Sequence, residues 1–228
     1  MITAENLRFR YNADAEELFG GLDQQFPERC LSVITGASGR GKSTLLYLIG
    51  LLISPTEGRI RFRDTDVGDL SDGNRSALRA SSIGFVFQDA ALDTTRSVLD
   101  NVIEGALYAG VRRRAAEIRA RRLLDQFGVE LRSDHRPGEV SGGQAQRVGL
   151  CRALIKEPRI ILADEPTGNL DPANKGRVLD ILFEYCSEFG ATLITVTHDH
   201  ELVGRFDRVV DFNQFHREGK HASGGDGV

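Results

Sequence analysis

The sequence predicts an α/β fold in which helices flank a parallel sheet, with an antiparallel β layer and an inserted helical lobe. Four short apolar runs, each followed by polar residues, have the character of buried strands: Cys30–Thr35, Ile83–Phe87, Ile160–Ala163 and Thr192–Thr197. Helical patterns alternate with them at Lys42–Leu52, Ala115–Phe127, Gly143–Ile155 and Ala173–Phe189. This alternation is typical of a doubly wound sheet, which binds ligands at the carboxyl ends of its strands.

The other segments complete a single domain of 228 residues. Ile2–Tyr11 and Gly58–Arg63 alternate apolar and polar residues, which predicts half-exposed strands of an antiparallel layer. Residues 89–158 contain helical patterns and no convincing strand, so we expect a helical lobe there. The polar, glycine-rich residues 213–228 are expected to form a flexible tail. The predicted core and β layer then comprise residues 1–88 and 159–212.

Composition and charge exclude several classes of protein. A net charge of −4 argues against a general nucleic-acid binder, which needs a broad basic face. The three cysteines form no CxxC pair, so neither a metal knuckle nor a disulfide framework is indicated, and a reducing compartment is expected. The chain starts without a signal-like segment, and its longest apolar run, Leu45–Ile53, is too short for a bilayer. We therefore expect a cytoplasmic protein.

A phosphate-binding loop is the strongest local motif. Gly36-Ala37-Ser38-Gly39-Arg40-Gly41-Lys42-Ser43 matches GxxxxGK[ST] and lies between a predicted buried strand and a predicted helix that continues with Thr44. Backbone amides and the helix N-terminus can bind a polyphosphate, while Lys42 reaches its terminal phosphates and Ser43 ligates magnesium. A ligand-free glycine turn is a poor alternative, because it gives no reason for a lysine at the helix start.

Two adjacent carboxylates end the third predicted strand. Asp164 and Glu165 follow the apolar run Ile160–Ala163, and burying both is costly unless a cation meets them. We expect Asp164 to hold Mg²⁺ and Glu165 to polarise the attacking water as general base. ATP is favoured over GTP because no Asn-Lys-x-Asp element is present; Asn174-Lys175-Gly176-Arg177 lacks the aspartate.

Val140-Ser141-Gly142-Gly143-Gln144 resembles the LSGGQ signature of ATP-binding cassette (ABC) ATPases. The other landmarks of that family occur in order along the chain: Tyr11, the phosphate loop, Gln88, the signature, Asp164-Glu165, Asn169-Leu170-Asp171 and His198. The resemblance covers nearly the whole chain. It implies a P-loop NTPase (RecA-like) core and Mg-ATP hydrolysis.

The resemblance also implies a role for each matched residue. Tyr11 stacks on the base, although an edge-strand aromatic is the alternative interpretation, and Gln88 joins Ser43 and Asp164 at the metal. Gln88, Lys42, Glu165 and His198 serve catalysis, with His198 at the γ-phosphate. Ser141, Gly142, Gly143 and Gln144 contact the nucleotide of a second cassette, because a helix N-terminus here is an additional anion site. Asp171 lies at the seam of the resulting dimer, which is a homodimer or a pair with another cassette.

Partners follow from the same resemblance. Leu162–Asp171 together with Tyr108-Ala109-Gly110 looks like the branch serving lipoprotein release, macrolide or peptide export, and cell division. Such cassettes sit on the inner face of the cell membrane through separate permease subunits, whose coupling helix docks near the segment after Gln88. The alternative, a soluble ABC-type ATPase of DNA maintenance, normally carries long heptad insertions. The basic stretch Val111–Arg114 faces phospholipid headgroups or an acidic partner, or is a solvated helix face.

Overall fold

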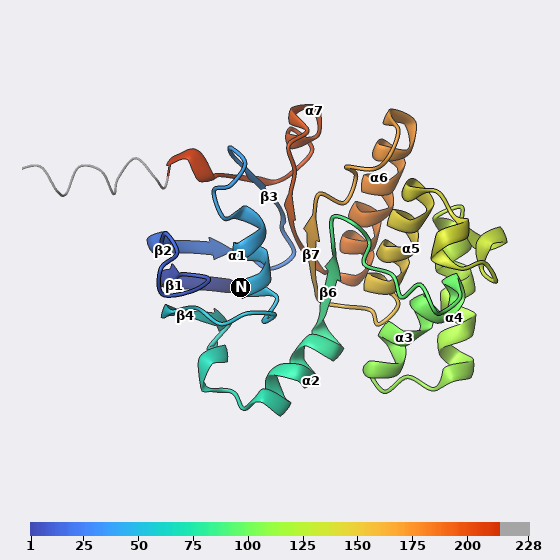
Figure 1. Ribbon diagram of the computed structural model, residues 1–228, viewed down its shortest axis with the longest axis horizontal. Helices are drawn as coiled ribbons and strands as arrows, with labels where there is room; N and C mark the ends of the chain where they lie inside the picture. Colours follow the sequence, from blue (N-terminus) through green and yellow to red (C-terminus); the bar gives the residue numbers. More distant parts are fainter. Residues whose placement is uncertain (215–228) are drawn as a thin grey trace, which may run out of the picture.

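The computed structural model describes residues 1–214, except for the side chains of Pro172, Ala173 and His200 (Figure 1). Its centre is a five-stranded parallel sheet in the order β6-β7-β8-β3-β9, as expected from the alternating pattern. The strands are β3 (Leu31–Thr35), β6 (Ile83–Val86), β7 (Ile160–Asp164), β8 (Thr192–Val196) and β9 (Arg208–Asp211). The predicted α/β fold class is therefore confirmed.

The antiparallel layer has four strands in the order β2-β1-β4-β5. They are β1 (Ile2–Phe9), β2 (Leu18–Phe26), β4 (Glu57–Phe62) and β5 (Thr65–Asp66), followed by a 3-10 turn at Val67–Asp69. The sequence prediction missed β2. Its regular alternation is broken where Phe19 and Gly21 adopt positive φ angles of 60° and 93°, next to register shifts against β1. These irregularities leave few alternating positions to identify the strand.

Helix α1 (Lys42–Ile49) lies between the antiparallel layer and the parallel sheet, whereas α5 (Gly142–Leu154) and α6 (Pro172–Phe189) lie on the other side of that sheet (Figure 1). The side chains of β7 show the same division. Leu162 belongs to the hydrophobic core around α1, and its neighbours Ile161 and Ala163 belong to the core around α5 and α6. Because successive strand residues point to opposite faces, α1 and α5 cover opposite faces of the sheet.

Helices α3 (Val98–Tyr108), α4 (Arg113–Gln126) and α5 pack together in the predicted lobe, with 3-10 turns at Glu130–Arg132 and Pro137–Glu139. Residues 89–158 contain no strand in the structure, as expected. The prediction missed α2 (Asp72–Ser82), which buries none of its residues and contains only three apolar ones, Ala77, Leu78 and Ala80. It also missed β9 and α7 (His200–Val203), each of only four residues.

The predicted tail begins within the described part of the chain. Asn213 is bonded there, because its Oδ1 accepts the amide of Ala37 at 3.1 Å. Residues 215–228 lie outside the described residues. The extent of the tail therefore stays a prediction.

Candidate nucleotide-binding site

The phosphate loop joins β3 to α1 and depends on its glycines. Gly36, Gly39 and Gly41 have φ angles of 135°, 76° and 85°, which residues with a Cβ rarely adopt. A Cβ on Gly41 would also lie 2.8 Å from the Phe19 ring. Gly41 caps α1 without a side-chain hydrogen bond, so no side-chain oxygen competes for the first amides of the helix.

Lys42 is folded into the loop. Its Nζ donates to the carbonyls of Gly36 at 2.9 Å and Ala37 at 2.8 Å, and the residue is 5% exposed. Burial lowers the pKa of Lys42, while the carboxylates of Glu165 and Asp164 oppose that shift. The ammonium is thus held by weak carbonyl partners beside the loop, where an anion would be a stronger partner.

Ser43 and Asp164 meet at the end of β7. The Ser43 hydroxyl donates to Oδ1 of Asp164 at 2.9 Å, and the Tyr47 hydroxyl donates to Oδ2 at 3.4 Å. Burial raises the pKa of Asp164, and these two hydrogen bonds oppose the shift. A carboxylate and a hydroxyl oxygen in contact are suitable ligands for a hard divalent cation. The sequence prediction missed Tyr47, although it lies one helical turn after Ser43.

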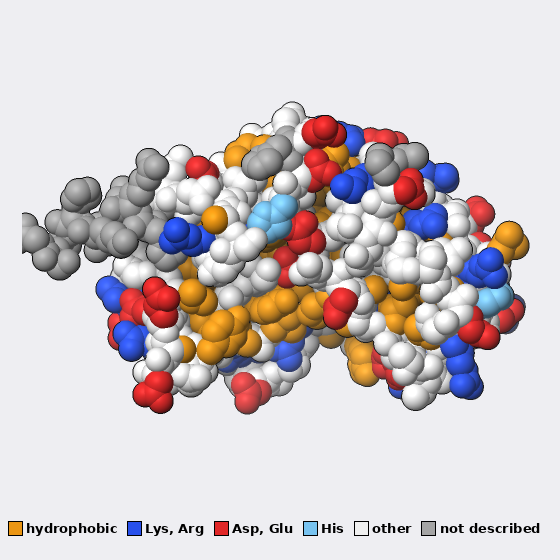
Figure 2. All heavy atoms as spheres, turned by 45° about the horizontal axis from the view of Figure 1, so that its top comes forward, with side chains coloured by type: hydrophobic (Ala, Val, Ile, Leu, Met, Phe, Trp, Pro, Cys, Tyr) orange, Lys and Arg blue, Asp and Glu red, His pale blue; other side chains and the backbone are white. Residues whose placement is uncertain are grey.

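Glu165 follows Asp164 in a left-handed conformation, with φ of 48°. Its Oε1 is buried and accepts no hydrogen bond within the described residues; Nε2 of His198 lies 3.4 Å away. Burial raises the pKa of Glu165, and His198 opposes this. On the face shown in Figure 2, a histidine side chain lies directly beside acidic side chains. A carboxylate oxygen that accepts no hydrogen bond can take a proton from water, as a general base must.

Gln88 lies at the same sheet edge. It follows β6, in which Val86 pairs with Ala163 of β7, so the segments after these two strands reach this edge together. The Gln88 carbonyl accepts Nδ2 of Asn169 at 3.2 Å, a contact between distant segments that sequence reasoning missed.

Tyr11 approaches the site from β1. Its hydroxyl is 2.8 Å from the Thr44 hydroxyl on α1, and Phe9 packs edge-on against its ring. The residue is nevertheless 62% exposed. An anchored but exposed aromatic ring can stack on a nucleotide base.

The signature forms the N-terminus of α5. Ser141 and Gln144 make a reciprocal capping box: Ser141 Oγ accepts the Gln144 amide at 3.3 Å, and Gln144 Oε1 accepts the Ser141 amide at 2.9 Å. Ser141 and Gly142 are exposed, and a Cβ on Gly142 would meet nothing within 4 Å. The structure does not bring this helix tip onto the chain's own phosphate loop, because α1 and α5 cover opposite sheet faces. Asp171 is the N-cap of α6 and follows Asn169, whose carbonyl oxygen would lie 3.3 Å from a Cβ on Gly143.

Comparison with known proteins decides the family. Residues 19–168 match the family model described as ABC transporter. The chain belongs to the ABC transporter family. It is an ATP-binding subunit that hydrolyses ATP.

Relatives of this cassette include lipoprotein-releasing system ATP-binding proteins. The LolD protein of Cereibacter sphaeroides is 45% identical over 177 residues, covering 78% of this chain and 79% of the relative. The LolD protein of Syntrophus aciditrophicus is 41% identical over 212 residues, covering 92% and 95%. Both matches confirm the resemblance inferred from the signature.

Solved structures of cassettes share the fold. MJ0796 in a dimeric post-hydrolysis state bound to ADP and Pi has a TM-score of 0.87 and 32% identity, covering 92% of this chain and 94% of that one. A second dimeric structure of MJ0796, a bacterial ABC transporter cassette, matches with a TM-score of 0.87 and 33% identity over the same shares. Within residues 1–214 of this cassette, no helix combines the length and apolar character needed to cross a bilayer.

Proposed function

We propose that two copies of this cassette close around two Mg-ATP, each phosphate loop facing the signature of the other copy, and that closure drives separate membrane subunits. The placement of the two anion sites carries the proposal. The phosphate loop starts α1 on one face of the sheet, and the exposed tip of α5 lies on the other. A helix tip that faces away from its own nucleotide can serve the nucleotide of a partner.

In this arrangement Ser43, Gln88 and Asp164 hold Mg²⁺, which neutralises charge on the phosphates when it is bound. Gly36–Thr44 cradles the phosphates and Tyr11 stacks on the adenine. Glu165 takes a proton from the attacking water through Oε1, which accepts no hydrogen bond within the described residues, and His198, whose Nε2 lies 3.4 Å from that oxygen, contacts the γ-phosphate. Asp171 lies at the seam between the copies. Doubling of the molar mass on addition of Mg-ATP tests the dimer.

Closure is driven by the nucleotide in this proposal. A charge-assisted hydrogen bond contributes about 1.5 to 3 kcal/mol. Association costs roughly 4 to 15 kcal/mol in lost freedom. Several such bonds from Ser141, Gly142 and Gly143 to each of two γ-phosphates offset that cost, so the dimer forms with ATP and opens after hydrolysis.

Replacing Lys42 with Ala tests the phosphate loop. The ammonium would exchange two carbonyl partners for phosphate oxygens, so its loss is expected to weaken ATP binding by about 1.5 to 3 kcal/mol, roughly ten- to a hundredfold. Equilibrium binding of a fluorescent ATP analogue measures this, with thermal unfolding of the nucleotide-free variant as the control for folding. Wild-type affinity in a folded Lys42→Ala variant would contradict the assignment.

A groove between α2, β6 and the helical lobe is the proposed docking surface for the membrane subunit. Its volume is about 680 Å³, and the residues that line it include Leu52, Ala77, Phe85, Phe87, Tyr108 and the cations Arg79, Arg152 and Lys156. None of the described residues that line it carries a carboxylate. Burial lowers the pKa of Lys156 to about 8. An apolar segment that carries a carboxylate fits this lining, as a cytoplasmic helix of a permease would.

Replacing Ala77 with Glu tests the groove. Ala77 is an exposed residue of α2 that lines the groove, so the substitution adds bulk and negative charge there without disturbing the core. We expect the ATPase activity of the isolated cassette to be unchanged and its retention on native membranes to fall several-fold. Asn74→Glu on the same helix, outside the groove lining, is the matched control. Equal retention of both variants would contradict the docking site.

The similarity to lipoprotein-releasing proteins supports a cargo that is lipophilic and extracted from a membrane. This assignment places the cassette at the inner face of the cell membrane, held there by its permease subunits. Measuring ATPase stimulation of the reconstituted complex by lipidated against unlipidated peptide tests the cargo class. Stimulation by the lipidated peptide alone is expected, and equal rates with the two peptides would contradict it.

A further inference from the structure

Two consecutive alanines after Gln88 have a backbone conformation that is unfavourable for them. Ala90 and Ala91 have φ angles of 59° and 45°. A left-handed conformation brings Cβ close to the following carbonyl oxygen, so alanine adopts it only where surrounding contacts hold it. The segment that carries Gln88 therefore depends on contacts from other parts of the chain.

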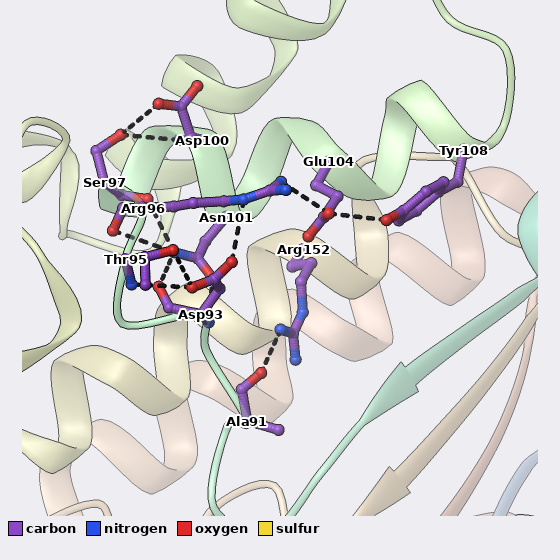
Figure 3. Close-up of polar contacts among 10 residues, drawn as sticks. All are labelled: Ala91, Asp93, Thr95, Arg96, Ser97, Asp100, Asn101, Glu104, Tyr108 and Arg152. Atoms are coloured by element: carbon purple, nitrogen blue, oxygen red, sulfur yellow. Dashed lines mark hydrogen bonds and ion pairs between the residues drawn. The ribbon is translucent and has the colours of Figure 1, made fainter.

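Arg152 makes such contacts. Its Nη2 donates to the Ala90 carbonyl at 2.5 Å, and its Nη1 donates to the Ala91 carbonyl at 2.6 Å. Figure 3 shows the bond to Ala91, with Arg152 reaching out from the last turns of α5. A planar guanidinium has parallel donors that suit two adjacent carbonyls, whereas a lysine ammonium is a point donor. Holding both carbonyls at once fixes the turn.

The same face of α5 holds the start of the segment. Nε2 of Gln146 donates to the Phe87 carbonyl at 3.2 Å. Gly149 packs against Ala90, whose Cα would be at an ordinary contact distance of 3.4 Å from a Cβ on Gly149. Gln146, Gly149 and Arg152 follow one another at three-residue spacing, so they line one side of the helix. Residues 87–91 are thus fixed to the helix that begins at the signature.

The following residues are held by α3 (Figure 3). Asn101 is fully buried; its Oδ1 accepts the Asp93 amide at 2.7 Å, and its Nδ2 donates to the carbonyls of Asp93 at 3.0 Å and Ser97 at 2.9 Å. Arg96 bonds Glu104 at 2.7 Å. The segment after Gln88 is therefore held at its far end by α3, whereas Arg152 on α5 bonds both carbonyls of its turn at Ala90 and Ala91.

Arg152 also lines the groove, beside Phe87 and Tyr108. We propose that Arg152 is a positioning residue for ATP hydrolysis, which holds the turn after Gln88 from α5 and so sets where Gln88 stands at the metal. This inference rests on the role proposed for Gln88. The Arg152 side chain extends from the signature helix, lines the groove and bonds the turn after Gln88. It therefore connects the proposed docking surface with the proposed metal site.

Steady-state kinetics of Arg152→Met with the isolated cassette test the inference. The phosphate loop is untouched, so ATP affinity is expected to stay within about twofold, whereas kcat is expected to fall on the order of tenfold because Gln88 is misplaced. Arg152→Lys should be intermediate, since it restores one donor. Arg61→Met is the matched control: Arg61 donates to a main-chain carbonyl, that of Asp64, but not to residues 87–91, and it lies outside the groove lining. It is expected to keep the wild-type kcat.

A double-mutant cycle with Gln88→Ala separates positioning from a general loss of structure. If Arg152 acts through Gln88, Arg152→Met lowers kcat in the wild-type background and has little further effect in Gln88→Ala. Equal factors in both backgrounds, or an unchanged kcat for Arg152→Met, would overturn the inference while leaving the proposed function intact. A wild-type kcat for Gln88→Ala alone would overturn the proposed role of Gln88, and this inference with it.

Discussion

Glu165→Gln is expected to bind ATP normally, to lose almost all turnover and to accumulate as a dimer. The amide keeps the size and planar shape of the carboxylate but cannot take a proton. General base catalysis contributes roughly 10²- to 10⁴-fold, so kcat should fall by that factor. ATP would then persist between the two copies, and the closed state would not open. The phosphate loop is unaffected, because the hydrogen bonds of Lys42 go to loop carbonyls rather than to Glu165.

Phosphate release and size-exclusion chromatography with Mg-ATP measure the two effects together. Glu184→Gln is the matched control, since Glu184 is an exposed residue in the C-terminal half of α6, away from the carboxyl ends of the parallel strands. It should hydrolyse ATP at the wild-type rate. A Glu165→Gln variant that turns over ATP at that rate would show that another group accepts the proton.

Ser141→Arg is expected to bind ATP with nearly wild-type affinity and to hydrolyse none above background. Ser141 caps α5 and is exposed, on the sheet face opposite the chain's own phosphate loop. An arginine there removes the cap and places a bulky side chain at the helix tip that receives the partner's γ-phosphate. Its effect therefore falls on closure and hydrolysis and spares binding to the single copy.

The control removes an equivalent cap elsewhere. Ser71 caps α2 by accepting the Asn74 amide. Ser71→Arg therefore lowers the stability by about 1 kcal/mol, as the loss of the Ser141 cap does. It should keep its ATPase activity. If Ser141→Arg and Ser71→Arg hydrolyse ATP equally well, the signature has no role in a partner's site.

The sequence predicts those parts of the site whose functional residues lie within a few positions of one another along the chain. The glycine pattern of Gly36–Ser43 and the carboxylates after Ile160–Ala163 each combine a strand, a turn and a functional group within a few residues. Local backbone requirements determine them, and the structure places them at one sheet edge. The roles of these residues nevertheless depend on a ligand and a second copy, and stay predictions until the variants are measured.

The contacts that the sequence does not predict are long-range. Asn169 reaches the Gln88 carbonyl and Asn213 reaches the Ala37 amide only because sheet order and register bring these segments together. Nothing near Asn213 in the sequence indicates its partner, which is why it was expected in a flexible tail. The sequence prediction missed strand β2 for a local reason, because positive φ angles at Phe19 and Gly21 interrupt its alternation of apolar and polar residues.

Light-scattering molar mass of Glu165→Gln and of the double variant Glu165→Gln/Ser141→Arg, both saturated with Mg-ATP, tests the two-copy site most directly. We expect Glu165→Gln at twice the 25.1 kDa chain mass and the double variant at the chain mass, with ATP bound to both. A double variant that dimerises as fully as Glu165→Gln would contradict the claim that the α5 tip of one copy closes on the nucleotide of the other.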